Sequence, residues 1–215
     1  MTRRPPPPPL LPPLFRTGRT GRCTGRLYQC EFPGGHGVRQ LSGDARKSTV
    51  TLIRVLGIDP GSRVTGVGVV EVDGQSLRHV HSECIRAGDG ELGERLAVIY
   101  SGVGDAIAQY QPQSVAIERV FLATNPHAAL ILGHARGSAM LAAVNQGLAV
   151  SEYSALEIKR SVVGTGRAEK EQVQHMVRVL LGMDRRPPSD AADALACAIC
   201  HIHTAQVAQR LAKVQ

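Results

Sequence analysis

Four carboxylates stand at the ends of apolar segments, and this placement constrains the fold more than any other feature of the sequence. Asp59 and Glu118 each end a short apolar run, whereas Asp190 and Asp193 open a segment that is otherwise apolar. A carboxylate at the end of a buried strand raises the free energy of the fold unless a cation or a hydrogen-bond donor satisfies it. Clustered acids with few basic neighbours in sequence indicate a site for a hard divalent cation, most often Mg²⁺.

The composition changes sharply near residue 50. Residues 1–49 are rich in Pro, Gly and Arg without apolar periodicity, so we expect a disordered, low-complexity extension. No apolar stretch suited to a secretory signal follows its arginines, and the amphipathic helix of a transit peptide is lacking. We interpret this segment as a non-native extension, with Val50 a misread initiator. We expect a folded domain over 50–205, and a tail or the end of the last helix over 206–215.

The basic character of the chain belongs to that extension. Residues 1–53 contain 9 Arg or Lys and 2 Asp or Glu, a net charge of +7, whereas residues 54–215 contain 16 of each and carry none. Nucleic-acid binding by the folded part would therefore depend on local patches. No run approaches the ~20 apolar residues of a membrane span. Five cysteines, an odd number, indicate a reducing cytoplasm rather than a disulfide scaffold.

The remaining pattern predicts an α/β fold, with a five-stranded mixed sheet flanked by helices. Alternating or continuously apolar runs predict strands, and a period near 3.6 predicts helices. We expect Asn125 and Ser189 to cap two of these helices, with Pro126 at the first helical position of the former. The expected strands are 53–59, 64–72, 76–85, 113–120 and 148–153, and the expected helices are 91–110, 125–145, 156–163, 169–181 and 190–212.

This element order brings the four acids together. Asp190 and Asp193 share one face of the last helix because they are three residues apart. If the first and fourth strands are neighbours, Asp59 and Glu118 lie side by side beneath that helix. Such a cluster can hold two Mg²⁺ ions and hydrolyse a phosphodiester. Taken singly, the helical pair could simply cap the helix, and Asp59 could be a turn residue.

Four blocks of the sequence resemble one family, the RuvC Holliday-junction resolvases. The blocks are Leu56-Gly-Ile-Asp-Pro-Gly-Ser-Arg-Val-Thr-Gly66, Ala116-Ile-Glu-Arg-Val-Phe121, Lys170-Glu-Gln-Val-Gln-His-Met-Val177 and Asp190-Ala-Ala-Asp-Ala-Leu-Ala196. The resemblance implies a ribonuclease H-like fold and a homodimer that works with a RuvA–RuvB branch-migration complex. It also implies paired nicks in opposing strands of a four-way DNA junction, which leave 5′-phosphate and 3′-hydroxyl ends. Mg²⁺ would serve as cofactor, two ions per active site, with Mn²⁺ as a substitute.

The same resemblance assigns roles to individual residues. Asp59, Glu118, Asp190 and Asp193 would be the metal ligands and catalytic acids. Phe121 would stack on an opened base at the junction centre, which any base allows through its π-face. The residues expected to contact the DNA backbone are Lys159, Lys170, Arg119, Arg160 and Arg167. The chain departs from the family pattern at Thr124, Ile131 and His134, which bears on DNA affinity rather than on the acids.

Other functions fit parts of the sequence. Asp59-Pro-Gly-Ser also resembles the phosphate loop of actin-type ATPases, although that superfamily needs two such domains. A module that binds junctions without cutting them is a third reading. The Cys197-Ala-Ile-Cys200-His201 pattern matches haem attachment, but we interpret these cysteines as helix packing. A zinc site that adds His203 is disfavoured because one helix cannot aim all four side chains at one ion.

Overall fold

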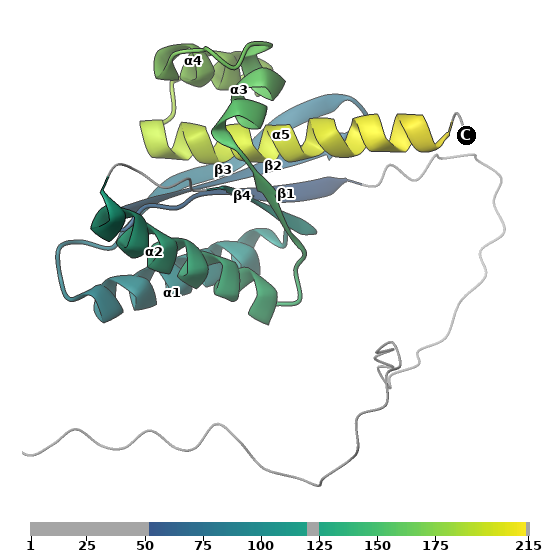
Figure 1. Ribbon diagram of the computed structural model, residues 1–215. Helices are drawn as coiled ribbons and strands as arrows, with labels where there is room; N and C mark the ends of the chain where they lie inside the picture. The colour runs from purple at the N-terminus through teal and green to yellow at the C-terminus, as the bar shows by residue number, and fades with distance from the viewer. Residues whose placement is uncertain (1–51, 120–124, 214–215) are drawn as a thin grey trace, which may run out of the picture. The chain divides into compact units, whose positions relative to one another are not determined.

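The strands form a mixed sheet in which β1 is central (Figure 1). The structure is a computed structural model that describes residues 52–119 and 125–213. The strands are β1 (Ile53–Asp59), β2 (Val64–Asp73), β3 (Ser76–Arg86), β4 (Ser114–Glu118) and β5 (Val150–Tyr153), in the order β3-β2-β1-β4-β5. The first three form an antiparallel meander, whereas β4 runs parallel to β1, and β5 parallel to β4.

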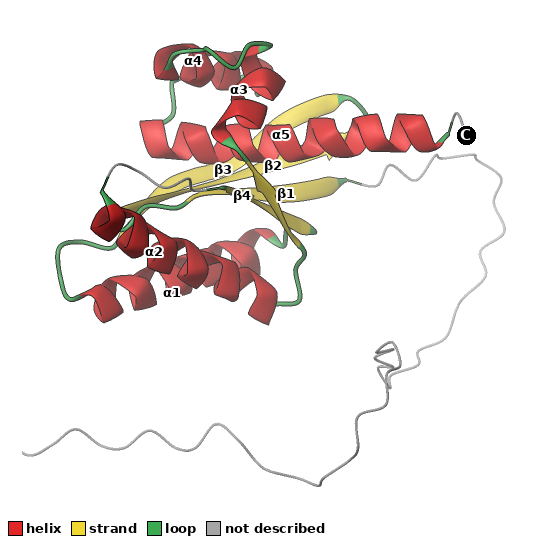
Figure 2. Cartoon of the chain, viewed as in Figure 1, coloured by secondary structure: helices red, strands yellow, loops and turns green. Residues whose placement is uncertain are grey.

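Helices cover both faces of this sheet (Figure 2). They are α1 (Leu92–Tyr110), α2 (Pro126–Asn145), α3 (Ala155–Val163), α4 (Lys170–Leu180) and α5 (Ser189–Ala212). The side chains of β1 alternate between two cores, as the period of two in a strand requires. Leu56 and Ile58 pack with α1 and α2, whereas Val55 packs with α3, α4 and α5. Asp59 shares the strand face of Val55 and therefore points to the α5 side.

Glycines let α5 lie directly on the backbone of β1 and β2. A Cβ at Gly57 would overlap the carbonyl oxygen of Ala194, and one at Gly66 would overlap that of Asp190. At Gly68 the added atom would lie 2.7 Å from the Leu195 side chain. The helix therefore packs closely at Gly57, Gly66 and Gly68. The contact brings the first turn of α5 down onto the end of β1.

The predicted elements are all present, with small shifts at their ends. The strands expected over 113–120 and 148–153 are shorter, at 114–118 and 150–153 among the described residues. The cap at Asn125 is confirmed, because its side chain accepts hydrogen bonds from the amides of His127 and Ala128 at 3.0 and 3.3 Å. Residues 1–49, expected to be an extension, lie outside the part that the structure describes.

The predicted cap at Ser189 is wrong. The helix α5 begins at Ser189 itself, and Pro188 is the flanking residue, with φ −52° and ψ 151°. Its carbonyl accepts a hydrogen bond from the amide of Ala192 at 2.8 Å. Proline suits this position because its ring fixes φ near the observed value, while the extended ψ ends the preceding loop. In the described residues, no helix is both long enough and apolar enough to cross a membrane.

Candidate active site

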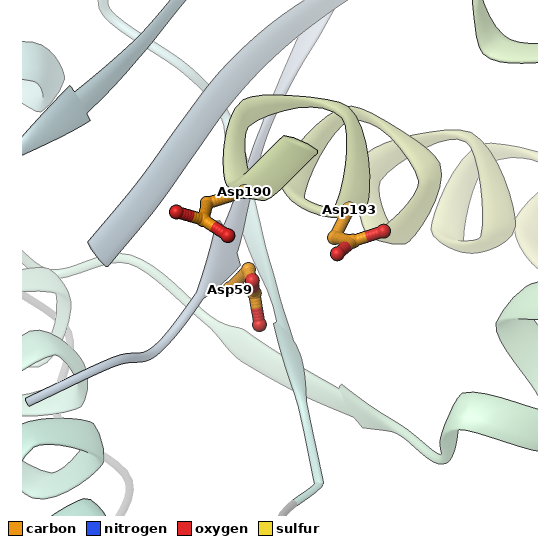
Figure 3. Close-up of side chains that lie close together, drawn as sticks. All are labelled: Asp59, Asp190 and Asp193. Atoms are coloured by element: carbon orange, nitrogen blue, oxygen red, sulfur yellow. The ribbon is translucent and has the colours of Figure 1, made fainter. Parts of the chain in front are cut away.

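Three aspartates from two elements converge at the end of β1 (Figure 3). Asp59 is the last residue of β1, and Asp190 and Asp193 lie in the first two turns of α5. Each offers one carboxylate oxygen, and these three oxygens all lie within 4.8 Å of one another. The prediction that the strand acid and the helical pair meet is confirmed. An all-oxygen donor set of this kind fits a hard divalent cation.

A hydroxyl fixes the turn that follows Asp59. The buried Thr65 Oγ1 donates a hydrogen bond to the carbonyl of Gly61 at 2.8 Å and accepts one from its amide at 3.3 Å. These two bonds satisfy the turn between β1 and β2 without help from the Asp59 side chain. The carboxylate is therefore not needed as a turn residue and is left free to bind a cation.

Glu118 approaches the cluster from β4. The parallel register pairs Ile58 with Ile117, so the residues that follow them, Asp59 and Glu118, end adjacent strands at the same edge. Glu118 is not one of the three close aspartates but lines a neighbouring cavity of about 170 Å³ together with Asp193, Lys159 and Lys170. The predicted quartet is thus arranged as a tight trio with Glu118 across a small cavity.

Burial and the repulsion of neighbouring carboxylates make Asp59, Glu118 and Asp193 reluctant to ionise. Burial, followed by the charges of Asp193, Glu118 and Asp190, raises the pKa of Asp59 to about 8. Burial also raises the pKa of Glu118 and of Asp193, and each repels a neighbouring carboxylate. Like charges held close in a partly desolvated site favour the protonated forms. A bound cation would remove this penalty, so the electrostatics and the donor types both fit a metal.

One lysine lies inside this acidic cluster. The Nζ of Lys170, from the start of α4, is 2.8 Å from an oxygen of Asp193 and 4.0 Å from one of Asp190. The hydrogen bond to Asp193 raises the pKa of Lys170. Sequence reasoning expected this lysine to face the DNA backbone. Its position beside the aspartates suits it equally to offset charge on a phosphate bound there.

The other expected DNA contacts are distributed unevenly. Lys159 lines the cavity beside Glu118, whereas Arg160 and Arg167 are exposed on α3 and on the turn after it. Arg119 is engaged within the protein, because its Nη2 lies 3.5 Å from a Glu157 oxygen and donates to the carbonyl of Glu152 at 3.3 Å. Phe121 and Thr124 lie outside the described residues. Two further departures, Ile131 and His134, lie on α2.

Sequence reasoning missed the salt bridge that borders Glu118. Arg136 of α2 donates from Nε to the Glu118 carbonyl at 3.2 Å, and its Nη2 lies 2.6 Å from an oxygen of Glu152 on β5. The sequence did contain a clue to this contact. Of the four charged residue types Asp, Glu, Lys and Arg, α2 contains a single residue, Arg136. A single charge in such a helix needs a specific partner.

The cysteine and histidine motif in α5 has a structural role. Cys197 and Cys200 are buried in the helix, as expected. His201 bonds the Ser114 hydroxyl at 3.1 Å and the Tyr153 hydroxyl at 2.9 Å, which ties α5 to β4 and β5. Within residues 52–119 and 125–213, the side chains grouped closely enough to hold a metal are the three aspartates. The haem and zinc readings therefore gain no support.

The sheet order and the acids at one edge of it define a ribonuclease H-like enzyme that cuts nucleic acid. The chain belongs to the RuvC family, because the sequence profile of crossover junction endodeoxyribonuclease RuvC matches residues 55–201. It is a hydrolytic nuclease of that family, which removes the actin-type alternative.

Individual relatives support this membership. The RuvC of Yersinia enterocolitica is 56% identical over 161 residues, covering 75% of this chain and 93% of the relative. That of Marinobacter nauticus is 52% identical over 159 residues, covering 74% and 91%. A Thermus thermophilus RuvC in complex with a Holliday junction substrate matches with a TM-score of 0.69 and 34% identity, covering 73% and 96%. The yeast mitochondrial resolvase Ydc2, at 14% identity and a TM-score of 0.52, shares the fold.

Proposed function

We propose that this protein resolves Holliday junctions in recombination and repair, with Asp59, Glu118, Asp190 and Asp193 as its metal ligands and catalytic acids. The observation that carries the proposal is the convergence of three carboxylate oxygens within 4.8 Å at the end of β1. The raised pKa of Asp59 and the family membership of the chain support a nuclease role for that cluster. Paired symmetric nicks that leave 5′-phosphate and 3′-hydroxyl ends complete the proposed reaction.

The cluster would hold two Mg²⁺ ions, with Mn²⁺ as a substitute. Bound there, the ions would supply an activated water and stabilise the leaving oxygen of the phosphodiester. Asp59, Asp190 and Asp193 would supply the close ligand oxygens, and Glu118 would add a further carboxylate from the neighbouring cavity. Lys170 would keep the ligands oriented through Asp193 and offset negative charge on the phosphate.

Basic side chains around the cluster would hold the four-way junction. Lys159 lines the cavity next to Glu118, and the exposed Arg160 and Arg167 extend the patch along α3. These residues suit phosphate contacts, which supply affinity without sequence preference. Arg119 would join them only by leaving its contact with Glu157. Phe121 is proposed to stack on an opened base at the junction centre.

The outward face of α2 would form the interface of a homodimer. Leu130, Leu141 and Val144 are 61%, 52% and 56% exposed, and they recur on one side of the helix at spacings of eleven and three residues. Two glycines, Gly133 and Gly137, lie on the same side, in an apolar groove of about 510 Å³. Small residues flanked by leucines allow two helices to approach closely. A second copy of the chain would supply the matching surface through two-fold symmetry and present a second active site to the opposing strand.

Two further expectations follow from the family. We propose that the protein acts in the cytoplasm and meets its junctions in the company of a RuvA–RuvB branch-migration complex. A pull-down of those proteins on an immobilised junction would test the second expectation.

A junction-cleavage assay tests the central proposal. Purified protein is mixed with a synthetic four-way junction, with and without Mg²⁺, and the products are mapped on a denaturing gel. We expect paired nicks that need the metal. Asp59→Asn and Glu118→Gln should abolish cutting and retain binding, whereas Asp105→Asn, an exposed acid on α1, should cut normally. Binding without any nicks by the unaltered protein would instead support the inactive module.

The proposed dimer interface has its own test. Leu130→Glu should convert the protein to a monomer in sedimentation experiments and uncouple the two nicks. Val207→Glu is the matched control, because Val207 is a comparably exposed apolar residue on α5, at 54%. A Leu130→Glu protein that stays dimeric would place the interface elsewhere.

A further inference from the structure

The single charged side chain of α2 is aimed at the end of the active-site strand. The Arg136 side chain is 20% exposed, and its Nε donates to the carbonyl oxygen of Glu118 at 3.2 Å. Its Nη2 lies 2.6 Å from a Glu152 oxygen, but the approach is not aligned as a hydrogen bond, so the attraction is between charges. One guanidinium therefore joins α2, the end of β4 and β5.

The contact with Glu118 falls on its backbone. A hydrogen bond to a carbonyl fixes the peptide plane, and that plane sets the direction in which the side chain leaves the main chain. On the next residue, the amide of Arg119 donates to the Tyr153 carbonyl at 2.7 Å. The peptide that joins Glu118 to Arg119 is thus held from both sides, by α2 at its oxygen and by β5 at its nitrogen.

Fold stability alone is a poor reason for this arginine. A partly buried ion pair is often no more stabilising than well-packed apolar side chains of the same volume. Apart from His127, His134 and Asn145, the rest of α2 is apolar or small, and its inner face packs through alanines such as Ala135 and Ala139. An arginine here adds one thing that an apolar residue cannot, which is a fixed donor for the strand end.

We propose that Arg136, held by Glu152, is a positioning residue that orients Glu118 for metal binding. The inference rests on the proposed function, because it takes Glu118 as a ligand. It also connects the active site to α2, whose opposite face is the proposed dimer interface. Residues that orient ligands commonly change metal affinity or activity about 10- to 100-fold when they are replaced.

The test compares two arginines that make similar contacts at opposite ends of the sheet. Arg54, at the start of β1, also bonds a carboxylate and a carbonyl, with 3.0 Å to Glu71 and 3.1 Å to the oxygen of Tyr110. Arg136→Met and Arg54→Met remove comparable interactions, but only the first touches the site. Mn²⁺ binding is followed by the electron paramagnetic resonance signal of the free ion, and cleavage is followed in single turnovers at saturating junction.

Arg136→Met should weaken Mn²⁺ binding about tenfold and raise the Mg²⁺ concentration needed for half-maximal cleavage by a similar factor. Junction affinity should not change, and Arg54→Met should leave both metal readouts at the wild-type value. Equal metal affinities in the two variants, with equal losses of thermal stability, would make Arg136 purely structural and overturn the proposal. If the unaltered protein cuts no junction, the proposed function fails, yet the Mn²⁺ titration still decides the role of Arg136.

A double-mutant cycle with Glu152 covers the case in which Arg136→Met does not fold. Arg136→Lys keeps the charge beside Glu152 but loses the forked donor, so it should fall between wild type and Met in Mn²⁺ affinity. Glu152→Gln should reproduce part of the loss. Combined with Arg136→Lys, it should add less than the sum of the two single effects. Strict additivity of the two substitutions would show that the pair does not act as a unit.

Discussion

Replacing Asp59 by asparagine should make the metal-free protein less sensitive to alkaline pH. The pKa of Asp59 is raised from 3.8 to about 8, mainly by burial and then by its carboxylate neighbours. Between these values the folded protein holds a proton that the unfolded chain has lost. Stability therefore falls as pH rises through this window, and it is greatest below pH 4 as far as this group is concerned.

The size of the effect follows from how steeply the free energy of unfolding changes with pH when the folded and unfolded states bind different numbers of protons. One extra proton in the folded state corresponds to about 1.4 kcal/mol per pH unit. From pH 5.5 to 8, Asp59 should thus remove about 3 kcal/mol from the free energy of unfolding. Asparagine has nearly the same shape but cannot ionise, so the stability difference between variant and wild type should widen by that amount. Mg²⁺ should reverse the order by stabilising the wild type more.

The assay is urea unfolding with a metal chelator at several pH values. The difference between two proteins cancels the titration of groups that both share. Asp105→Asn, an exposed acid on α1, provides the control and should track the wild type at every pH. A difference between Asp59→Asn and wild type that stays within about 1 kcal/mol over the whole range would refute the reasoning, since it would mean that the ionised carboxylate costs nothing in this site.

Three other outcomes can be checked. Mg²⁺ affinity should rise with pH between 6 and 8, by up to about tenfold per unit, because the proton on Asp59 must leave; calorimetry in buffers of different ionisation enthalpy would detect its release. Gly57→Ala should cost about 3 kcal/mol or more in urea unfolding, because the new Cβ meets the helix backbone, whereas Gly93→Ala, with open space on α1, should not destabilise. Glu71→Gln should cost about 2 kcal/mol, seen as a lower melting temperature, because the buried carboxylate loses its charge opposite Arg54 at 3.0 Å.

The apolar runs carried enough information to predict the sheet and the meeting of the acids. Asp59 and Glu118 could be placed together because each ends a run whose length and position suit a central strand. The helical pair followed from its spacing of three. These are local patterns, and a fold of this order leaves few ways to arrange them.

Contacts between side chains that are far apart in sequence could not be predicted from these local patterns. Lys170 precedes Asp193 by 23 residues, and only the packing of α4 beside α5 brings their charges to 2.8 Å. The Arg136 contact with Glu118 and Glu152 needs the depth at which α2 lies against the sheet. The predicted cap at Ser189 was wrong for a local reason. Serine and proline stand next to each other and both suit a helix boundary, and the proline occupies the flanking position.

The helix α5 packs directly on the backbone of β1 and β2, and this matters for any attempt to transfer the proposed site to another protein. Gly57 and Gly66 let main-chain atoms, rather than side chains, set the height of the helix above the strands. Mg²⁺ tolerates little variation in its bonds to oxygen. A scaffold given the four proposed ligands but larger residues beneath the helix would hold those carboxylates at the wrong height to bind the ion. The glycines should therefore be grafted as part of the chemistry, even though they hold no atom that touches it.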